Sequence, residues 1–184
     1  MAGTAQAITN NDAVFLALLV RIEPASAYLI SKTYQQSPVS NYGTSKGKIY
    51  PLIRRLKDLG LVEAATVQDD GRGTELLKCT AKGRKVLRDW TLRIQPSFLL
   101  LEDPFRTMVQ SFNLLTSSER LDWVKTAREA LLEKREELEA YGASVAVPFH
   151  DEVHDNAVSS INSRLQWLDR LEHSLAGSSR GAGD

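Results

Sequence analysis

The sequence is poor in cysteine and in long apolar runs, the features of disulfide-rich proteins and of membrane-spanning proteins. It contains a single cysteine, Cys79, so no disulfide can form within the chain, which fits a reducing compartment. The apolar run from Ala13 to Val20 is too short to cross a bilayer, and no basic segment precedes an apolar run near the start. We therefore expect a soluble, cytoplasmic protein that has no membrane partner.

Catalytic motifs are also missing. Neither a nucleophile-elbow sequence nor a phosphate-cradling glycine-rich loop occurs. His150 and His154 stand four residues apart, as two zinc ligands on a helix do, but no third ligand is evident and two ligands do not close a metal site. We expect a protein that is not an enzyme and that needs no metal or cofactor. A metal-dependent enzyme built on these two histidines is a competing hypothesis.

The whole chain has a net charge of zero, but its two halves carry opposite net charges. The sequence carries 23 Lys and Arg against 23 Asp and Glu. Residues 1–90 hold 13 of the basic and 8 of the acidic residues, a balance of +5, which leaves 10 and 15, a balance of −5, for residues 91–184. A basic half joined to an acidic half predicts that one half meets a polyanion while the other has a different task.

The stretch from Gly43 to Gly60 carries the most informative pattern. Ser45 is a good helix N-cap, and Gly60 is a good helix stop. Between them, an apolar face lies opposite a cationic face that also holds Tyr50 and Pro51, where we expect a loosened first turn rather than a break. The apolar residues are Ile49, Leu52, Ile53, Leu56 and Leu59, and the cations are Lys46, Lys48, Arg54, Arg55 and Lys57. Such a helix suits a DNA major groove, whereas a solvated amphipathic helix is the plain alternative.

The neighbouring segments predict a helix-turn-helix followed by a β-hairpin wing. One helix is expected from Asn10 or Asn11 to Ile22, and a second, capped by Ser26, is expected to end at Gln36. After Gly60, two β-compatible runs at 61–67 and 74–80 flank a turn at 68–73, and Thr80 can cap a further helix. The residues expected to contact DNA are Ser45, Lys46, Lys48, Tyr50, Arg54 and Arg55 on the cationic helix and Arg72 at the wing tip.

The second half predicts two long amphipathic helices. Thr116 and Glu119 have capping-box spacing and open a helix that is expected to reach Tyr141. A last helix, ended by Gly177, carries apolar residues in alternating steps of three and four, as in a coiled-coil seam. We expect this seam to pair with a second copy of the chain, and burial within one chain against the first and fourth helices is the alternative. The predicted dimerisation residues are Val158, Ile161, Leu165, Leu168 and Leu175.

These patterns together predict a mainly α-helical fold. An N-terminal winged helix-turn-helix of three helices plus a β-hairpin wing is expected over 1–95, a helical C-terminal dimerisation domain over 96–176, and a disordered tail over 177–184. Aromatic side chains accumulate between Trp90 and Trp167 and could line an effector pocket near the junction of the halves, or form ordinary core. They are Trp90, Phe98, Phe105, Phe112, Trp123, Tyr141, Phe149 and Trp167.

Two segments carry a family resemblance. The run from Ser45 to Leu56, SKGKIYPLIRRL, followed by Gly60-Leu61-Val62, resembles the signature of PadR-type regulators, with its Tyr-Pro-x-Leu element, basic pair and glycine exit. The run CTAKGR from Cys79 to Arg84 is similar to the family's segment after the wing. The likeness covers about residues 12–95. It departs from the family pattern in the second helix, where Ala27-Tyr28-Leu29 replaces Gly-Tyr-Glu, and in a less basic wing.

The resemblance implies a dimeric transcriptional regulator, usually a repressor, whose winged helix-turn-helix binds a palindromic operator in double-stranded DNA. Some members of the family sense small aromatic molecules, so an aromatic effector is an implied partner. A winged-helix module that docks a partner protein, without specific DNA binding, is the alternative function.

Overall fold

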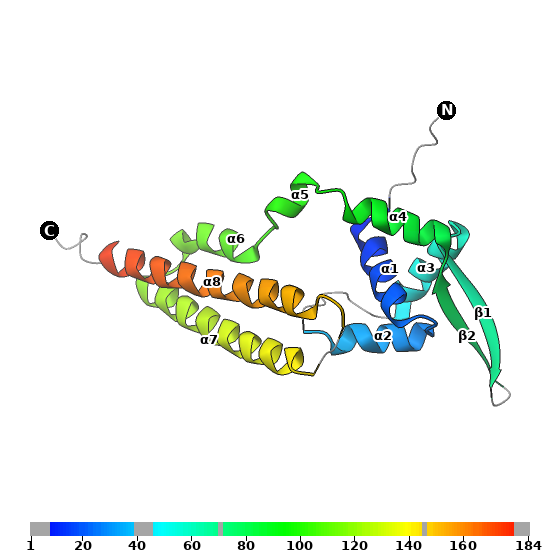
Figure 1. Ribbon diagram of the computed structural model, residues 1–184. Helices are drawn as coiled ribbons and strands as arrows, with labels where there is room; N and C mark the ends of the chain where they lie inside the picture. Colours follow the sequence, from blue (N-terminus) through cyan, green and yellow to red (C-terminus); the bar gives the residue numbers. More distant parts are fainter. Residues whose placement is uncertain (1–7, 39–45, 70–71, 145–146, 179–184) are drawn as a thin grey trace. The chain divides into compact units, whose positions relative to one another are not determined.

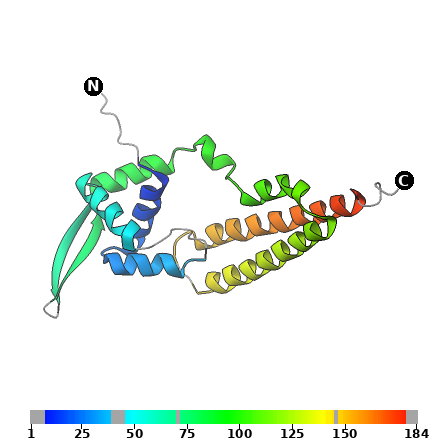
Figure 2. The same ribbon diagram turned by 180° about the vertical axis from the view of Figure 1, so that it is seen from behind.

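The computed structural model describes residues 8–38, 46–69, 72–144 and 147–178, which fall into two compact units, 1–100 and 101–184 (Figures 1 and 2). The fold is mainly helical, with a two-stranded antiparallel hairpin after three helices, and this confirms the predicted winged helix-turn-helix followed by a helical domain. The first unit contains α1 (Asn10–Ile22), α2 (Ala27–Gln36), α3 (Lys46–Asp58), β1 (Val62–Asp69), β2 (Arg72–Cys79), α4 (Ala81–Thr91) and α5 (Pro96–Leu99). The second contains α6 (Pro104–Gln110), the 3₁₀ turn η1 (Phe112–Leu114), α7 (Ser117–Gly142) and α8 (His150–Ser178).

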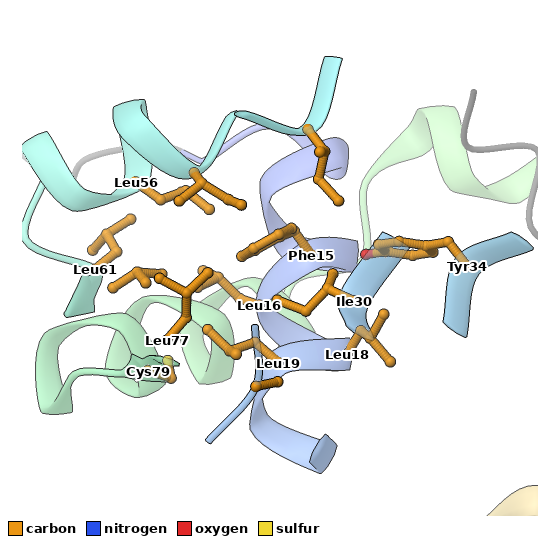
Figure 3. Close-up of a cluster of buried hydrophobic side chains, with 14 residues drawn as sticks. Phe15, Leu16, Leu18, Leu19, Ile30, Tyr34, Leu56, Leu61, Leu77 and Cys79 are labelled. Atoms are coloured by element: carbon orange, nitrogen blue, oxygen red, sulfur yellow. The ribbon is translucent and has the colours of Figure 1, made fainter. Parts of the chain in front are cut away.

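The core of the first unit is built around α1, whose apolar side chains point toward α2, α3 and the hairpin (Figure 3). From α3, three residues of the predicted apolar face, Ile49, Ile53 and Leu56, are buried in it. Each fully buried Leu, Ile or Phe contributes about 1.5–3 kcal/mol through apolar surface removed from water. The side chains that are completely enclosed include Phe15, Leu16, Leu19, Ile30, Leu56, Leu61 and Leu77. The inner face of α3 is therefore fixed, and its opposite face is turned outward.

The N-terminus of α1 differs from the prediction. Thr9, rather than Asn10 or Asn11, caps the helix, because its hydroxyl accepts from the Asp12 N–H at 3.2 Å while the Asp12 carboxylate accepts from the Thr9 N–H at 2.9 Å. This reciprocal capping box satisfies two backbone donors at once, which a lone asparagine cap does not. Ser26 and Thr80 cap α2 and α4 as predicted.

The C-terminus of α3 is held by the chain that follows it. Gly60 adopts φ +67°, the left-handed conformation expected of a helix stop, and the Leu61 N–H donates to the Leu56 carbonyl at 2.9 Å. Two further carbonyls are satisfied from α4 and its cap: Thr80 Oγ1 donates to Gly60 O at 2.8 Å, and Lys82 Nζ donates to Leu59 O at 2.7 Å. The helix runs through Pro51 without a break.

The hairpin strands are longer than predicted. They pair antiparallel from Val62 opposite Cys79 to Asp69 opposite Arg72, so the ladder takes up most of the predicted turn at 68–73. Polar residues there can join the ladder because strand pairing uses backbone groups, which every non-proline residue supplies. At the other edge of β2, the Ala25 N–H donates to Leu77 O at 3.1 Å and the Leu77 N–H donates to Ala25 O at 2.9 Å, which ties the α1–α2 turn to the wing.

The second unit is dominated by the long helices α7 and α8, which lie side by side (Figures 1 and 2). The Thr116–Glu119 capping box at the start of α7 is confirmed. Between the two helices, Arg128 donates to Glu172 at 2.8 Å and to Asp169 at 2.7 Å. The bond to Glu172, and then the bond to Asp169, raise the pKa of the Arg128 guanidinium above its ordinary value. The buried seam consists of Val124, Ala127, Leu131, Leu138, Ile161 and Leu168.

The first compact unit ends at Leu100 and includes the short helix α5, which was not predicted. The Phe98 ring of α5 lies 5.7 Å from that of Trp90. Helix α8 continues through Gly177 to Ser178, since an exposed glycine near a helix end costs only about 1 kcal/mol. The rest of the predicted tail, 179–184, lies outside the described residues. Within the described ranges, every helix is too short or too polar to serve as a membrane span.

Candidate nucleic-acid interface

The outward face of α3 presents three of the predicted DNA-contacting residues to solvent. Lys48 and Arg54 are exposed, and Tyr50 is 54% exposed. Tyr50, Pro51, Arg54, Arg55 and Asp58 together line an open hollow of about 320 Å³ on this face. The hollow combines a phenol and a proline ring with a guanidinium and a carboxylate, so it offers both apolar contact and hydrogen-bonding groups to a ligand that covers it.

The cations of α3 differ in whether they are already paired. Lys57 makes an ion pair with Glu75 of β2, and Arg55 makes one with Asp12 of α1. Lys48 and Arg54 have no acidic partner in the part of the chain that the structure describes. A cation without a protein partner is available to a phosphate or a base edge at lower cost than one that must first leave a carboxylate. Lys48 and Arg54 are therefore the α3 cations best placed to bind a polyanion.

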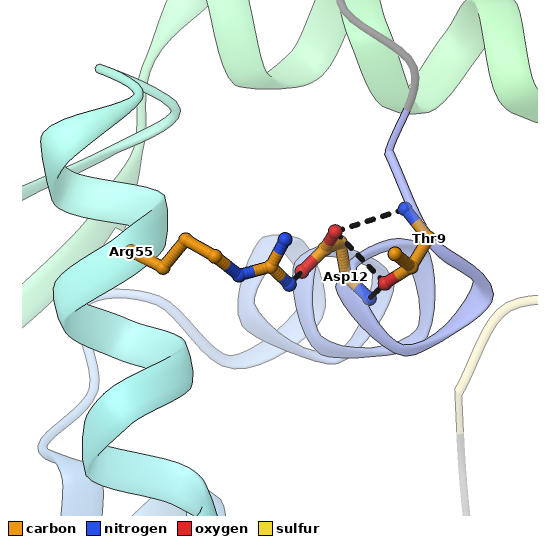
Figure 4. Close-up of polar contacts among 3 residues, drawn as sticks. All are labelled: Thr9, Asp12 and Arg55. Carbon is orange, nitrogen blue, oxygen red and sulfur yellow. Dashed lines mark hydrogen bonds and ion pairs between the residues drawn. The ribbon is translucent and has the colours of Figure 1, made fainter.

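Arg55 occupies a different environment from its neighbour Arg54. Its side chain extends from α3 to the start of α1, where Nη2 donates to Asp12 Oδ1 (Figure 4). Asp12 Oδ2 accepts from both the N–H and the hydroxyl of Thr9, each at 2.9 Å. The Asp12 side chain is 1% exposed and that of Arg55 is 47% exposed. The sequence pattern placed Arg55 correctly at the edge of the cationic face but gave no sign of this partner.

Three of the predicted contact residues are not fully described. Ser45 lies outside the described residues, and for Lys46 and Arg72 the structure describes the backbone but not the side chain. Lys46 opens α3 and Arg72 opens β2. Their predicted roles at the groove edge and the wing tip remain predictions.

A second polar contact secures the base of the wing, and the sequence did not reveal it. Glu23 Oε2 accepts from the Cys79 N–H at 2.6 Å, and Oε1 accepts from Arg84 Nη2. One carboxylate thus joins the end of α1 to β2 and α4. The Cys79 thiol lies in the same buried region, and burial raises its pKa above the ordinary value of 9.0. No periodic signal links residues so far apart in the chain, so sequence patterns alone could not pair them.

Tyr28 is an exposed residue on the helix that precedes α3 in the helix-turn-helix. Its side chain is 72% exposed at the start of α2, and Lys32, one turn later, is also exposed. The sequence drew attention to Tyr28 only because Ala27-Tyr28-Leu29 departs from the Gly-Tyr-Glu element of the PadR-type pattern.

The predicted dimerisation residues lie in the α7–α8 seam. Ile161 and Leu168 are buried against α7 of the same chain, and Val158, Leu165 and Leu175 are partly buried against that cluster. This burial lies within one chain, but its partner is α7 and not the first and fourth helices of the alternative. Their predicted contact with a second copy is not tested by a single chain.

The two histidines close the turn between α7 and α8. Their rings stack with centroids 5.8 Å apart, and His150 Nε2 lies 3.0 Å from the Gly142 carbonyl oxygen. The His154 ring packs so closely on Gly142 that an added Cβ would lie 2.6 Å from Cε1. Among the described residues no group of three or more His, Cys, Asp or Glu is arranged to hold a metal ion. The arrangement gives both histidines a packing role at this turn.

The aromatic residues form separate groups rather than one. In the second unit, the Trp123 ring lies 5.3 Å from Phe105 and 5.2 Å from Phe112, and the Trp167 ring lies 6.4 Å from Phe105. Arg164 covers this group, with its guanidinium 5.5 Å from the centre of the Phe105 ring and an ion pair to Asp103 at 3.2 Å. Trp90 and Phe98 form a pair in the first unit, and Phe149 is exposed.

Comparison with known proteins gives the surface its context. The chain resembles the structure of Bacillus subtilis PadR in complex with operator DNA, with a TM-score of 0.76 and 21% identity over 91% of this chain and 99% of that one. It also resembles Bacillus subtilis PadR in complex with p-coumaric acid, with a TM-score of 0.72 and 20% identity over 90% and 98%. A PadR-like transcriptional regulator from Bacillus cereus matches with a TM-score of 0.68 and 18% identity over 94% and 99%.

At these identities the solved structures establish a shared fold. No curated protein matches the sequence at a significant level. The sequence itself matches a family description over residues 15–89, which span α1 to α4 and contain the outward face of α3. Over these residues the chain is similar to the Transcriptional regulator PadR-like family.

Proposed function

We propose that this protein is a sequence-specific DNA-binding transcriptional regulator whose α3 enters the major groove. The observation that carries the proposal is the outward face of α3, where Lys48 and Arg54 are exposed and have no acidic partner among the described residues. The apolar contacts of Ile49, Ile53 and Leu56 hold that face outward. The structural likeness to a PadR solved in complex with operator DNA supports DNA binding by this fold.

The residues of the hollow suggest how bases are read. Arg54 can donate two hydrogen bonds to a guanine edge, and Asp58 can accept one from the cytosine amino group. The Tyr50 and Pro51 rings offer apolar contact to a thymine methyl group. Lys48, with Lys46 and Ser45 at the start of the helix and Arg72 at the wing, would bind phosphates and fix the register of the protein on the duplex.

We further propose that the protein acts as a homodimer on a palindromic operator and that it represses transcription. Leu101, Met108 and Leu114 are exposed in the second unit, which supports contact with a second copy there in addition to the partly buried α8 residues. A two-fold protein matches a two-fold operator, with one reading helix for each half-site.

An aromatic effector is part of the same proposal. The cluster of Phe105, Phe112, Trp123 and Trp167 lies beneath the Arg164 guanidinium, so an aryl ring would find aromatic partners there. An acidic group on the ligand would compete with Asp103 for that guanidinium. A PadR of the same fold has been solved with p-coumaric acid, an aromatic acid, which supports this class of ligand.

The test is DNA binding by a double variant, Lys48→Gln with Arg54→Gln. The probe is a duplex that the wild-type protein selects from a random-sequence pool, and a scrambled duplex of equal composition measures non-specific binding. We expect specific affinity to collapse and the slope of log K against log salt to become shallower by about 0.9 for each phosphate that the variant no longer neutralises.

Lys125→Gln is the matched control, since Lys125 is exposed on α7 and has no acidic partner among the described residues. It should bind as wild type does. Equal binding by the double variant and the wild type would refute the assignment to α3, and failure of the wild type to select any duplex would favour a protein-docking module instead.

A further inference from the structure

We infer that Asp12 is a positioning residue for DNA recognition, which acts by holding Arg55 and thereby fixing how α3 is presented to the groove. The inference rests on the proposed function, since it concerns the helix proposed to read DNA. It assigns Arg55 to the clamp rather than to a direct DNA contact, in contrast to its neighbour Arg54.

The first step is that the buried carboxylate of Asp12 needs a cationic partner. Its side chain is 1% exposed, and it is the buried charged residue of the described core. Thr9 supplies two donors to Oδ2, but both are neutral, and a buried carboxylate without a cation is strongly unfavourable. Arg55 is the cation that reaches Oδ1. Asp12 therefore needs Arg55 in the folded protein, independently of any DNA.

The second step is geometric. The apolar contacts of α3, through Ile49, Ile53 and Leu56, resist separation but have no direction, so they permit small rotations and shifts of the helix. The bond from Arg55 to Asp12 has a direction and a length, because a planar guanidinium donates along its N–H bonds. Asp12 in turn is fixed by the capping box of α1. The clamp thus sets the rotation of α3 against α1. Because Arg54 is the next residue along the same helix, the clamp also sets the direction in which Arg54 faces.

The third step concerns charge. A guanidinium already paired with a buried carboxylate releases few counterions from DNA, because the pair together carries no net charge. Arg55 should therefore contribute to specificity through the position of α3 and little to the salt dependence of binding. Lys48, which has no acidic partner among the described residues and is proposed to bind a phosphate, should contribute to that salt dependence.

The experiment compares Arg55→Gln with Lys48→Gln, on the selected duplex and its scrambled control, as a function of salt. We expect Lys48→Gln to lower the salt slope by about 0.9, the value for one phosphate that is no longer neutralised. Arg55→Gln should leave the slope unchanged while lowering the ratio of specific to non-specific affinity by about tenfold or more. A fall of the slope in Arg55→Gln equal to that in Lys48→Gln would overturn the inference.

Variants of Asp12 test the same bond from its other partner. Asp12→Asn releases the guanidinium, so a direct contact role would make specific binding tighter, whereas the clamp predicts that specificity falls as in Arg55→Gln. The double variant should lose no more specificity than either single one, because both remove the same bond. Tighter or unchanged specific binding by Asp12→Asn would count against the clamp.

Asp12→Glu covers the case in which the other variants fail to fold. Glutamate keeps the negative charge and remains suited to a capping box after Thr9, but it moves the carboxylate by one methylene. The clamp predicts a native circular dichroism spectrum with lowered specificity, and wild-type specificity in this variant would overturn it. A urea-unfolding cycle on Asp12→Asn, Arg55→Gln and the double variant measures the coupling of the two residues in stability and needs no DNA. If the two residues are coupled in stability but the wild-type protein selects no duplex, the clamp is present and the proposed DNA-binding function is wrong.

Discussion

At Gly83, helix α4 comes so close to the chain before β1 that a side chain has no room. A Cβ at this position would lie 2.2 Å from the Leu61 carbonyl oxygen and 2.8 Å from Cys79 Sγ. Because the first neighbour is backbone and cannot swing aside, we expect Gly83→Ala to lower the free energy of unfolding by about 3 kcal/mol. Urea unfolding followed by circular dichroism measures it.

Gly177→Ala serves as the control for this change. No atom lies within 4 Å of a Cβ at Gly177, and alanine favours a helix, so stability should stay the same or rise slightly. Wild-type stability in Gly83→Ala would show that α4 can move away from the hairpin at little cost.

Glu119 gives the first turn of α7 a dependence on pH. The Thr116 N–H and hydroxyl donate to its carboxylate, the N–H most effectively, and they hold the pKa of Glu119 below its ordinary value of 4.5. A carboxyl whose pKa is lowered by folding stabilises the folded state above the unfolded pKa and stops doing so as the pH falls through the folded one. Glu119→Gln should therefore be less stable than wild type at neutral pH.

The difference in unfolding free energy between the two proteins should vanish once the pH falls below the lowered pKa. Chemical denaturation at a series of pH values, with both proteins in the same buffers, gives the comparison. A gap that stays constant down to strongly acidic pH would mean that the charge of Glu119 has no part in the cap.

Single residues could be predicted from the sequence where a local pattern fixes them. The capping box of Thr116 and the outward position of Arg54 follow from spacing along one helix. The partner of Arg55 does not, because Asp12 is 43 residues away and lies on another helix. Which of two adjacent arginines is paired is decided by how α1 packs on α3, and periodicity carries no information on that.

Among the elements, the α7–α8 pair makes the clearest quantitative prediction. Leu168 is 0% exposed in the seam, so Leu168→Ala should leave a cavity and lower the unfolding free energy by about 3 kcal/mol. Val153 lies on the same helix and is 63% exposed, so Val153→Ala should change stability by less than about 0.5 kcal/mol. Equal, small effects for both in urea unfolding would show that α8 is held by something other than this seam.

The elements also show where sequence patterns stop short. The type of every long helix was predictable, since each has an apolar face with helical spacing. The short helix α5 was not, because four residues give no period, and it is held by the contact of Phe98 with Trp90. The hairpin outgrew its predicted ends because polar residues at 68–69 and 72–73 pair through backbone groups.

For the whole molecule, the apolar stripe of α8 was predictable but its partner was not. A seam with steps of three and four looks the same in sequence whether it faces α7 or a second copy, and Ile161 and Leu168 face α7. The charge difference between the halves has a clearer meaning. The half with the balance of +5 is the half that carries α3 and the wing, where a polyanion is proposed to bind.

The proposed two-fold assembly predicts how affinity depends on the geometry of the operator. If two copies bind as one unit, deleting half of the selected palindrome should weaken binding by about a hundredfold or more, because the second reading helix has no site to bind. Inserting about five base pairs between the half-sites should weaken binding similarly by turning them to opposite faces, and about ten should restore part of it. Electrophoretic mobility shifts on these duplexes, beside the intact one, give the measurement. Equal affinity for a half-site and a full site would leave a single copy as the binding unit, and the exposed Leu101, Met108 and Leu114 would then need another role.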